Sequence, residues 1–324
     1  MIDKMARGIA KHPKTVLIVC LILLIPSIIC YLNTFVNYDI LSYLPEDLNS
    51  VQGEHILDKT FNNAASAIVV IENEDQKTAV KLKEEISEID GVSNVMWVDD
   101  IADISIPEDM LPDDLKNVFY SKDGNATLMM VQFTQGGASE STMDAIKSIR
   151  KCMNKNMFMS GVSTIMYDTK ALADAQAPLY VVIAIVLALI VLMFTLKSYV
   201  LPFVLLMALC TAVVYNMGTN IFFGQISYIT QCIAAILQLG VTMDYSVFLM
   251  DRYEEERKHN DDRTMAMASA ISSTFVSLAG SSLTTVFGFL ALCFMSFKLG
   301  LDIGLVMAKG VLLGVITVVT FLPA

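Results

Sequence analysis

A charged side chain interrupts an apolar segment in the last third of the chain. Residues 239–250 read LGVTMDYSVFLM, and the acid among them, Asp244, is directly followed by Tyr245. A carboxylate at bilayer depth costs at least about 2.5 kcal/mol on insertion scales, so such a residue is by default a functional one. A carboxylate in this setting can bind and release a proton as its access alternates between the two sides of a membrane. The alternative is a buried acid that a structural partner holds.

The neighbours of Asp244 extend this hypothesis to a proton relay. The Tyr245 hydroxyl can donate a hydrogen bond to the carboxylate or pass a proton on. The same segment carries three further polar side chains that are candidate supporting groups: Gln238, Thr242 and Ser246. We therefore predict a proton relay formed by Asp244 and Tyr245, to which these three residues add polarity.

Lys309, in LVMAKGVLLG, is a second charge within an apolar segment. The depths of Lys309 and Asp244, counted from the inner ends of their predicted helices, differ by roughly 10 Å at the rise of an α-helix. One alternative is that the two side chains nevertheless pair directly. The other is that the lysine stem snorkels towards the membrane surface, or that its ammonium forms a hydrogen bond between helices. The sequence leaves both alternatives open.

The composition indicates a membrane protein. Hydrophobic residues make up 55% of the chain and charged residues 17%, against about 25% charged in a typical soluble domain. Six apolar runs are close in length to the about 20 residues that a helix needs to cross the hydrocarbon core of a bilayer. The predicted spans are residues 16–32, 179–196, 200–217, 228–250, 275–297 and 301–323. Residues 263–275 have little charge and are expected to lie along the inner interface, before the fifth span begins.

Basic residues set the expected orientation. They gather before the first span, between the second and third spans, and between the fourth and fifth: Lys4, Arg7, Lys11 and Lys14; Lys197; and Arg252, Arg257, Lys258 and Arg263. Because short basic segments stay on the cytoplasmic side, the N-terminus is expected in the cytoplasm. Residues 36–178 are then expected outside, in a multi-pass protein of the cell membrane.

Residues 36–178 differ in character from the rest, since they hold 24 of the 33 acids but 11 of the 22 bases. Short apolar runs predict strands at 66–72, 92–98, 125–134 and 157–162, and apolar residues on one helical face predict helices at 75–89 and 141–153. Residues 103–122, rich in Asp and Pro, are predicted as a loop. The order βαββαβ is the ferredoxin-like pattern. The predicted fold class is therefore a six-helix membrane bundle with an inserted extracytoplasmic α+β domain. The predicted domains are residues 1–35, 36–178 and 179–324.

Several classes of function lack support in the sequence. The six cysteines form no CxxC pair, and His12, His55 and His259 lie outside the predicted spans, so no metal site is expected. A phosphate-binding P-loop and a basic, aromatic-rich patch are also missing, so we expect no cofactor, nucleotide or nucleic acid. An intramembrane aspartyl protease would need Asp244 and Asp302 close together. Their predicted positions, near opposite sides of the membrane, argue against this, and no enzymatic activity is expected.

The segments GVTMDYSVFLMDRYEEER and GLVMAKGVLLGVITVVTFLPA resemble the MMPL branch of the RND transporter superfamily, as does the succession of one span, an outer domain and five spans. The resemblance implies export of lipids, hydrophobic compounds or drugs driven by the proton-motive force. It implies that the Asp-Tyr pair, here Asp244 and Tyr245, is the proton relay. It also implies twelve spans in two repeats, each with an outer porter domain. Because little follows the last apolar run, we expect this chain to be the N-terminal repeat.

The expected partners follow from this resemblance. They are membrane lipids, a hydrophobic or lipid substrate, and a second repeat or second copy that supplies the facing relay residues. An alternative function is a sterol-sensing-like membrane sensor or scaffold, which binds a ligand and transports nothing. Such a protein would bind its ligand regardless of the proton gradient.

Overall fold

The computed structural model describes residues 2–61, 65–102, 110–196 and 198–324. These residues divide into two compact units. The helical unit comprises residues 1–37 and 173–324, and the sheet unit comprises residues 38–172. The predicted positions of Lys197 and of residues 103–109 lie outside the described residues.

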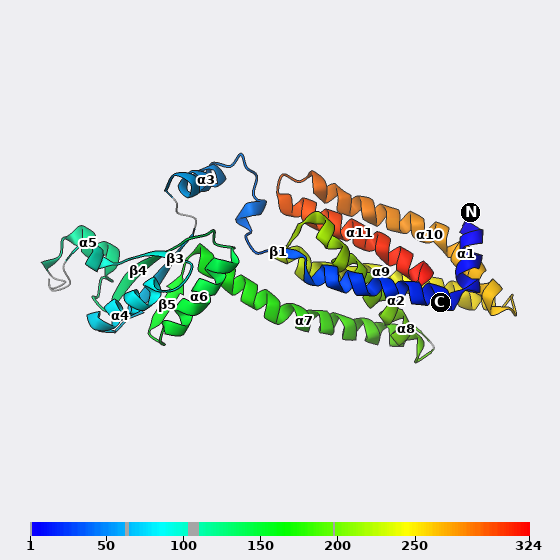
Figure 1. Ribbon diagram of the computed structural model, residues 1–324. Helices are drawn as coiled ribbons and strands as arrows, with labels where there is room; N and C mark the ends of the chain where they lie inside the picture. The colour runs from blue at the N-terminus through cyan, green and yellow to red at the C-terminus, as the bar shows by residue number, and fades with distance from the viewer. Residues whose placement is uncertain (1, 62–64, 103–109, 197) are drawn as a thin grey trace. The chain divides into compact units, whose positions relative to one another are not determined.

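The helical unit contains long apolar helices, most of which run side by side (Figure 1). They are α2 (Pro13–Leu32), the second part of α7 (Val162–Thr195), α8 (Leu201–Gly218), α9 (Tyr228–Arg257), α10 (Arg263–Ala291) and α11 (Lys298–Thr320), preceded by the short α1 (Ile2–Lys11). Within the described residues, six helices are long and apolar enough to cross a membrane, one for each predicted span. The chain is therefore a multi-pass membrane protein with a helical bundle.

Two helices begin earlier than predicted. Helix α10 starts at Arg263, so residues 263–275, expected as a separate interfacial segment, are its first turns. The Asp262 carboxylate caps this start by accepting a hydrogen bond from the Thr264 N–H (2.8 Å), and Ala266 and Ala270 are buried. The cap and the buried alanines make the helix continuous, because both favour helix at its first turns. Helix α7 likewise starts at Val162, and not at 179.

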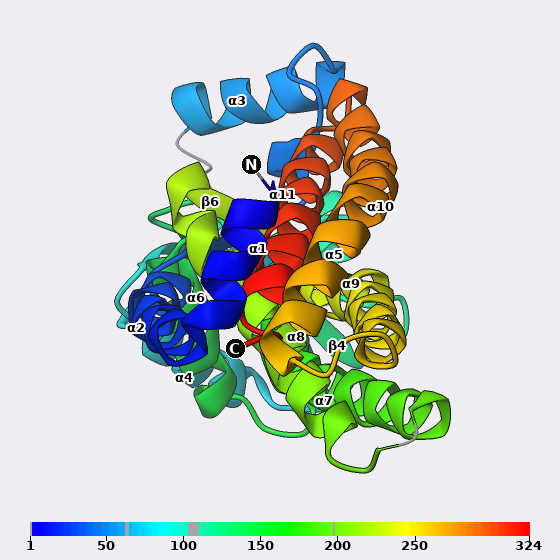
Figure 2. The same ribbon diagram turned by 90° about the vertical axis from the view of Figure 1, so that its right-hand side faces the viewer.

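Small residues let α11 approach its neighbours closely. A Cβ atom on Gly310 would lie 2.5 Å from the Asn216 Nδ2 atom of α8, and Gly314 lies against Thr242 of α9. These two glycines form the GxxxG spacing that permits such packing between membrane helices. Figure 2 shows α11 between α9, α10 and the short α1. Short elements lie between these long helices in the chain. They are the parallel strands β1 (Phe35–Asn37) and β6 (Gln225–Ser227) and the 3₁₀ helices η4 (Thr219–Phe223) and η5 (Leu292–Phe294).

The sheet unit contains an antiparallel sheet with strand order β3-β4-β2-β5. Its elements are β2 (Ser66–Glu72), α4 (Gln76–Ser87), β3 (Val92–Met96), η2 (Val98–Asp100), α5 (Asp113–Phe119), β4 (Ala126–Phe133), α6 (Glu140–Cys152) and β5 (Met157–Ser160), preceded by η1 (Leu41–Tyr43) and α3 (Asn49–Phe61). Each predicted strand and helix recurs with bounds shifted by at most two residues. Burial alternates along β2, where Ala67, Val69 and Ile71 are buried.

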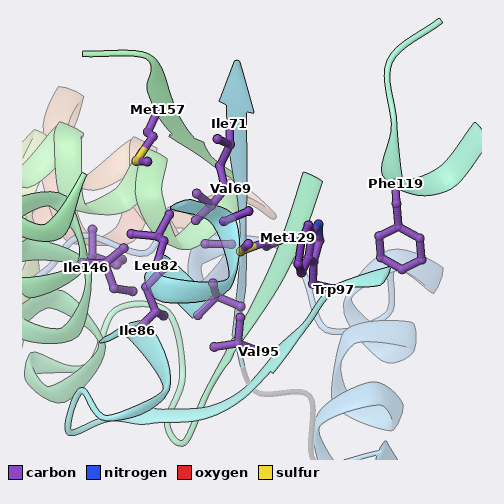
Figure 3. Close-up of a cluster of buried hydrophobic side chains, with 14 of the residues drawn as sticks. Val69, Ile71, Leu82, Ile86, Val95, Trp97, Phe119, Met129, Ile146 and Met157 are labelled. Carbon is purple, nitrogen blue, oxygen red and sulfur yellow. The ribbon is translucent and has the colours of Figure 1, made fainter. Parts of the chain in front are cut away.

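The core of the sheet unit packs α4 and α6 against β2 and β4, with Leu82, Ile86, Ile146 and Met129 among its side chains (Figure 3). Helix α5 corrects the prediction of a loop over residues 103–122. Its Phe119 is 4% exposed and belongs to this core. Leu111 and Leu115 of the same segment also pack against this core. The helix is therefore held by contacts with distant residues, which its own sequence pattern does not reveal.

Candidate functional site

Helix α9 carries the predicted relay. It begins after Ser227, whose hydroxyl accepts a hydrogen bond from the Ile229 N–H (3.2 Å), and it continues for about two turns past the predicted span. The extra turns hold Arg252, which forms ion pairs with Glu255 and Glu256 one turn later. Such pairs stabilise a helix that leaves an apolar environment.

Asp244 and Tyr245 point in different directions, since consecutive residues are about 100° apart around a helix. The Asp244 carboxylate is exposed in a groove of about 750 Å³ between α9 and α10. The Tyr245 ring borders the same groove, but it is 5% exposed and packs in a cluster with Leu249 and Ile271. Among the described residues, neither Asp244 nor the Tyr245 hydroxyl has a hydrogen-bond partner. The two predicted relay groups therefore share a groove and are not bonded to each other.

The other polar side chains of α9 lie on its opposite side. Gln238 donates from Nε2 to the Gly310 carbonyl of α11 (3.1 Å) and accepts at Oε1 from Asn216 of α8 (2.9 Å). The Thr242 hydroxyl donates to the Gln238 carbonyl (2.6 Å). Ser246 is fully buried, and its hydroxyl has no partner among the described residues. Gln238, predicted as a relay support, thus joins three helices, Thr242 bonds within α9, and neither side chain bonds to Asp244.

Lys309 forms a hydrogen bond between helices, which is one of its two predicted alternatives. Its ammonium donates to the Asn216 carbonyl (3.0 Å) and to the Asn220 Oδ1 atom, and it lies 4.8 Å from the centre of the Phe223 ring. The Asn216 carbonyl belongs to the last turn of α8, where the helix dipole favours a cation. Lys309 forms no ion pair with Asp244 in the described part of the chain.

Asp302, in the first turns of α11, caps another helix. Its Oδ2 atom accepts hydrogen bonds from the Ser227 N–H (2.7 Å) and the Thr230 hydroxyl (2.6 Å) at the start of α9. Asp244 lies further along α9 by about 21 Å, at 1.5 Å per residue. Two carboxylates so far apart cannot share a proton, so the geometry of an aspartyl protease is not formed.

A row of hydroxyls on α10 is a part of the groove that the sequence analysis missed. Ser277, Ser281 and Thr285 line the groove beside Asp244. The row continues towards α1 with Ser273 and Ser269, so that a hydroxyl recurs at every fourth residue. Positions four apart lie on one face of a helix. This spacing was the signal that could have identified the row.

Comparison with known proteins assigns the family. The sequence profile of the MMPL family matches residues 42–324. The chain belongs to the MMPL family. It is 24% identical over 269 residues to the putative membrane protein MJ1562 of Methanocaldococcus jannaschii, covering 76% of this chain and 69% of that protein.

Two mycobacterial relatives bear names that refer to transport. The probable transport protein MmpL12 of Mycobacterium tuberculosis is 24% identical over 232 residues, which are 68% of this chain and 20% of that protein. The siderophore exporter MmpL5 of the same organism is 19% identical over 216 residues, 63% of this chain and 22% of that protein. The chain thus spans about a fifth of the length of these two MMPL proteins.

Proposed function

We propose that this chain is the N-terminal repeat of a membrane transporter driven by the proton-motive force, with Asp244 and Tyr245 as its proton relay. The observation that carries the proposal is the groove between α9 and α10, in which a carboxylate stands on a membrane-crossing helix without a partner among the described residues. The groove hydroxyls Ser277 and Ser281 provide hydrogen-bond partners for water or for an incoming group.

The unsatisfied groups also support a partner at this groove. A buried polar group without a hydrogen bond costs about 1–3 kcal/mol, and the Tyr245 hydroxyl is such a group. A second repeat, or a second copy of the chain, that covered the groove could satisfy both Tyr245 and Asp244. A proton that Asp244 takes up from one side of the membrane, and later releases to the other side, would then change the charge of the interface twice in each cycle. That change of charge is the event we propose to couple to transport.

The sheet unit is, in this proposal, an extracytoplasmic ferredoxin-like porter domain within residues 36–178. Its antiparallel strand order, β3-β4-β2-β5, supports the ferredoxin-like assignment. We place the protein in the cell membrane with its N-terminus in the cytoplasm. The basic residues before α2 and after α9 support this orientation. Membrane lipids and a hydrophobic or lipid substrate are the proposed partners, in keeping with relatives named as transport proteins and as a siderophore exporter.

The experiment replaces Asp244 with Asn in the assembled protein and measures efflux from proteoliposomes with and without a proton gradient. Asn keeps the size of the side chain and removes the titratable group, so gradient-driven efflux should fall to the level seen without a gradient. Asp251→Asn is the matched control, because Asp251 is exposed on the same helix outside the groove. Efflux by Asp244→Asn that still responds to the gradient would refute the proposal.

A second candidate function is a sterol-sensing-like sensor or scaffold. It is favoured by a groove of about 520 Å³ between α2, α8 and α11, lined mainly by apolar side chains such as Val19, Leu23 and Ile316. A rigid apolar ligand could occupy it. Ligand binding that is unaffected by the proton gradient and by Asp244→Asn, without any efflux, would favour this sensor over the transporter.

A further inference from the structure

A second cavity, of about 780 Å³, lies between α1 and the first turns of α10. Helix α1 packs there through Ala6 and Ile9, which are 0% and 8% exposed and join the same cluster as Leu249 and Ile271 (Figure 2). The polar side of α1 is thereby turned away from the cluster, and its Arg7 and Lys11 line the cavity. The cavity is thus formed by packed helices and not by a loose end of the chain.

The charges around this cavity differ in whether they are already engaged. Glu256 pairs with Arg252 (3.0 Å), and Asp262 caps the start of α10. By contrast, Arg7 and Lys11 have no ion pair or hydrogen bond to side chains among the described residues. Asp3 is the remaining acid of the lining. Two cations are therefore available for a ligand, while two of the three acids are not.

Hydroxyl groups from α10 complete the lining. Thr264, Ser269 and Ser272 face the cavity from the helix opposite Arg7 and Lys11. A guanidinium, an ammonium and several hydroxyls together offer the donors that phosphate oxygens accept. A carboxylate would use fewer of these donors than a phosphate, which presents its oxygens in more than one direction. The chemistry of the lining thus favours a phosphate ester.

The surroundings indicate which phosphate ester. The cavity lies at the N-terminal end of α10, a helix that is long and apolar enough to cross a membrane. Met265 in the lining is 60% exposed, and further along the helix Val276 is 66% exposed. Exposed apolar side chains on such a helix face acyl chains. We propose that this cavity binds the phosphate of a membrane phospholipid headgroup, with Arg7 and Lys11 as its cationic contacts and the acyl chains along α10.

The test uses the full chain in detergent, stripped of lipid, and measures the melting temperature while short-chain phosphatidylglycerol or phosphatidylethanolamine is added. Diacylglycerol of the same chain length and inorganic phosphate are the reference probes. Both phospholipids should raise the melting temperature, whereas diacylglycerol, which lacks the phosphate, and inorganic phosphate, which lacks the chains, should raise it much less. An equal response to diacylglycerol or to inorganic phosphate would overturn the proposal without any variant.

The variants locate the response. Arg7→Gln with Lys11→Gln should weaken the apparent affinity for phosphatidylglycerol by about tenfold or more. Lys4→Gln with Lys14→Gln is the matched control, since it removes the same charge from exposed positions outside the cavity lining. Equal weakening in the two double variants would show a diffuse charge effect and reject the site. The proposal does not depend on transport, so a result on the relay leaves it unaffected.

Discussion

Gln238 and Thr242, on the side of α9 that faces α8 and α11, are hydrogen-bonded, whereas the two predicted relay residues at the groove with α10 have no hydrogen-bond partner among the described residues. On the first side, Gln238 bonds both to Asn216 and to the Gly310 carbonyl. On the second, the Asp244 carboxylate and the Tyr245 hydroxyl have no partner among the described residues. One helix thus combines a closed, structural face with an open face. The difference separates polar residues that hold the bundle together from polar residues that await another group.

The largest effect on stability is expected where the closed face is most crowded. Gly310→Ala places a methyl group 2.5 Å from the Asn216 Nδ2 atom, and overpacking of this kind lowers the free energy of unfolding by about 1–3 kcal/mol. Gly240→Ala, which borders the open groove with nothing within 4 Å, should leave it unchanged or raise it by about 0.5–1 kcal/mol. Thermal unfolding in detergent measures both. A similar loss in both variants would remove the distinction between the faces.

The cap that Asp302 provides for α9 should have the next largest effect. Asp302→Ala removes the acceptor for the Ser227 N–H and the Thr230 hydroxyl, and loss of a helix cap costs about 1–2 kcal/mol. Asp251→Ala, at an exposed position of α9, should change stability by less than about 0.5 kcal/mol. Equal melting temperatures for the two variants would contradict the assigned role of Asp302.

The sheet unit offers a hydrogen-bonded carboxylate for comparison, that of Asp100. Burial acts to raise the pKa of Asp100, but hydrogen bonds from Lys83 and from the Trp97 N–H outweigh burial and leave the pKa lowered. The resulting stabilisation is present above the unfolded value of about 3.9 and is lost as the pH falls through the lower folded value. In Asp100→Asn, the free energy of unfolding should therefore fall less on acidification than in the wild type. The difference should be below about 1 kcal/mol, because the carboxylate is 45% exposed.

Acid unfolding of the sheet unit can be followed by the fluorescence of Trp97, the single tryptophan of the chain, because its ring is buried in that unit. Lys83, the base of this ion pair, contributes to stability with the opposite pH dependence. Burial lowers the pKa of Lys83, yet the carboxylates of Asp100 and Asp99 raise it overall. Its contribution is therefore present below the unfolded value of about 10.4 and is lost as the pH rises through the folded one. If the free energy of unfolding of the wild type and of Asp100→Asn depended on acidic pH in the same way, the proposed contribution of the Asp100–Lys83 pair would be contradicted.

The smallest loss of stability is expected at Tyr245, despite its burial. Tyr245→Phe removes a buried hydroxyl that has no partner among the described residues, so the free energy of unfolding should stay the same or rise by up to about 3 kcal/mol while gradient-driven efflux falls. Tyr215→Phe is the matched control, because its hydroxyl donates to the Cys20 carbonyl (2.6 Å) and its loss should cost about 1 kcal/mol. Melting curves of the two variants that coincide would show that the Tyr245 hydroxyl is satisfied after all.

The features that the sequence predicts well are those that a short window determines. Hydropathy over about 20 residues locates each membrane-crossing helix, and alternation within residues 66–72 locates β2. Arithmetic along a helix axis also anticipated that Lys309 would lie at a different depth from Asp244. These properties depend on residues close together in the chain.

The features that the sequence did not predict depend on contacts between distant segments. Asp302 caps a helix that begins at Tyr228, and no local pattern relates the two positions. The direction in which Asp244 points depends on how α9 is rotated against α8, α10 and α11, which is a property of their packing. The hydroxyls of α10 were visible as a four-residue spacing, but their meaning required Asp244 to lie across the groove.

Helix α11 carries an acid and a base two turns apart, and each meets the pole of a neighbouring helix that suits its charge. Asp302 holds the positive start of α9, and Lys309 holds the negative end of α8. A slide of α11 by one turn, about 5.4 Å, would break both contacts at once and align neither with a replacement. The pair thus fixes the axial register of α11. Helices α8, α9 and α11 should accordingly keep their axial register relative to one another, because one contact at each end of this stretch of α11 opposes sliding in either direction.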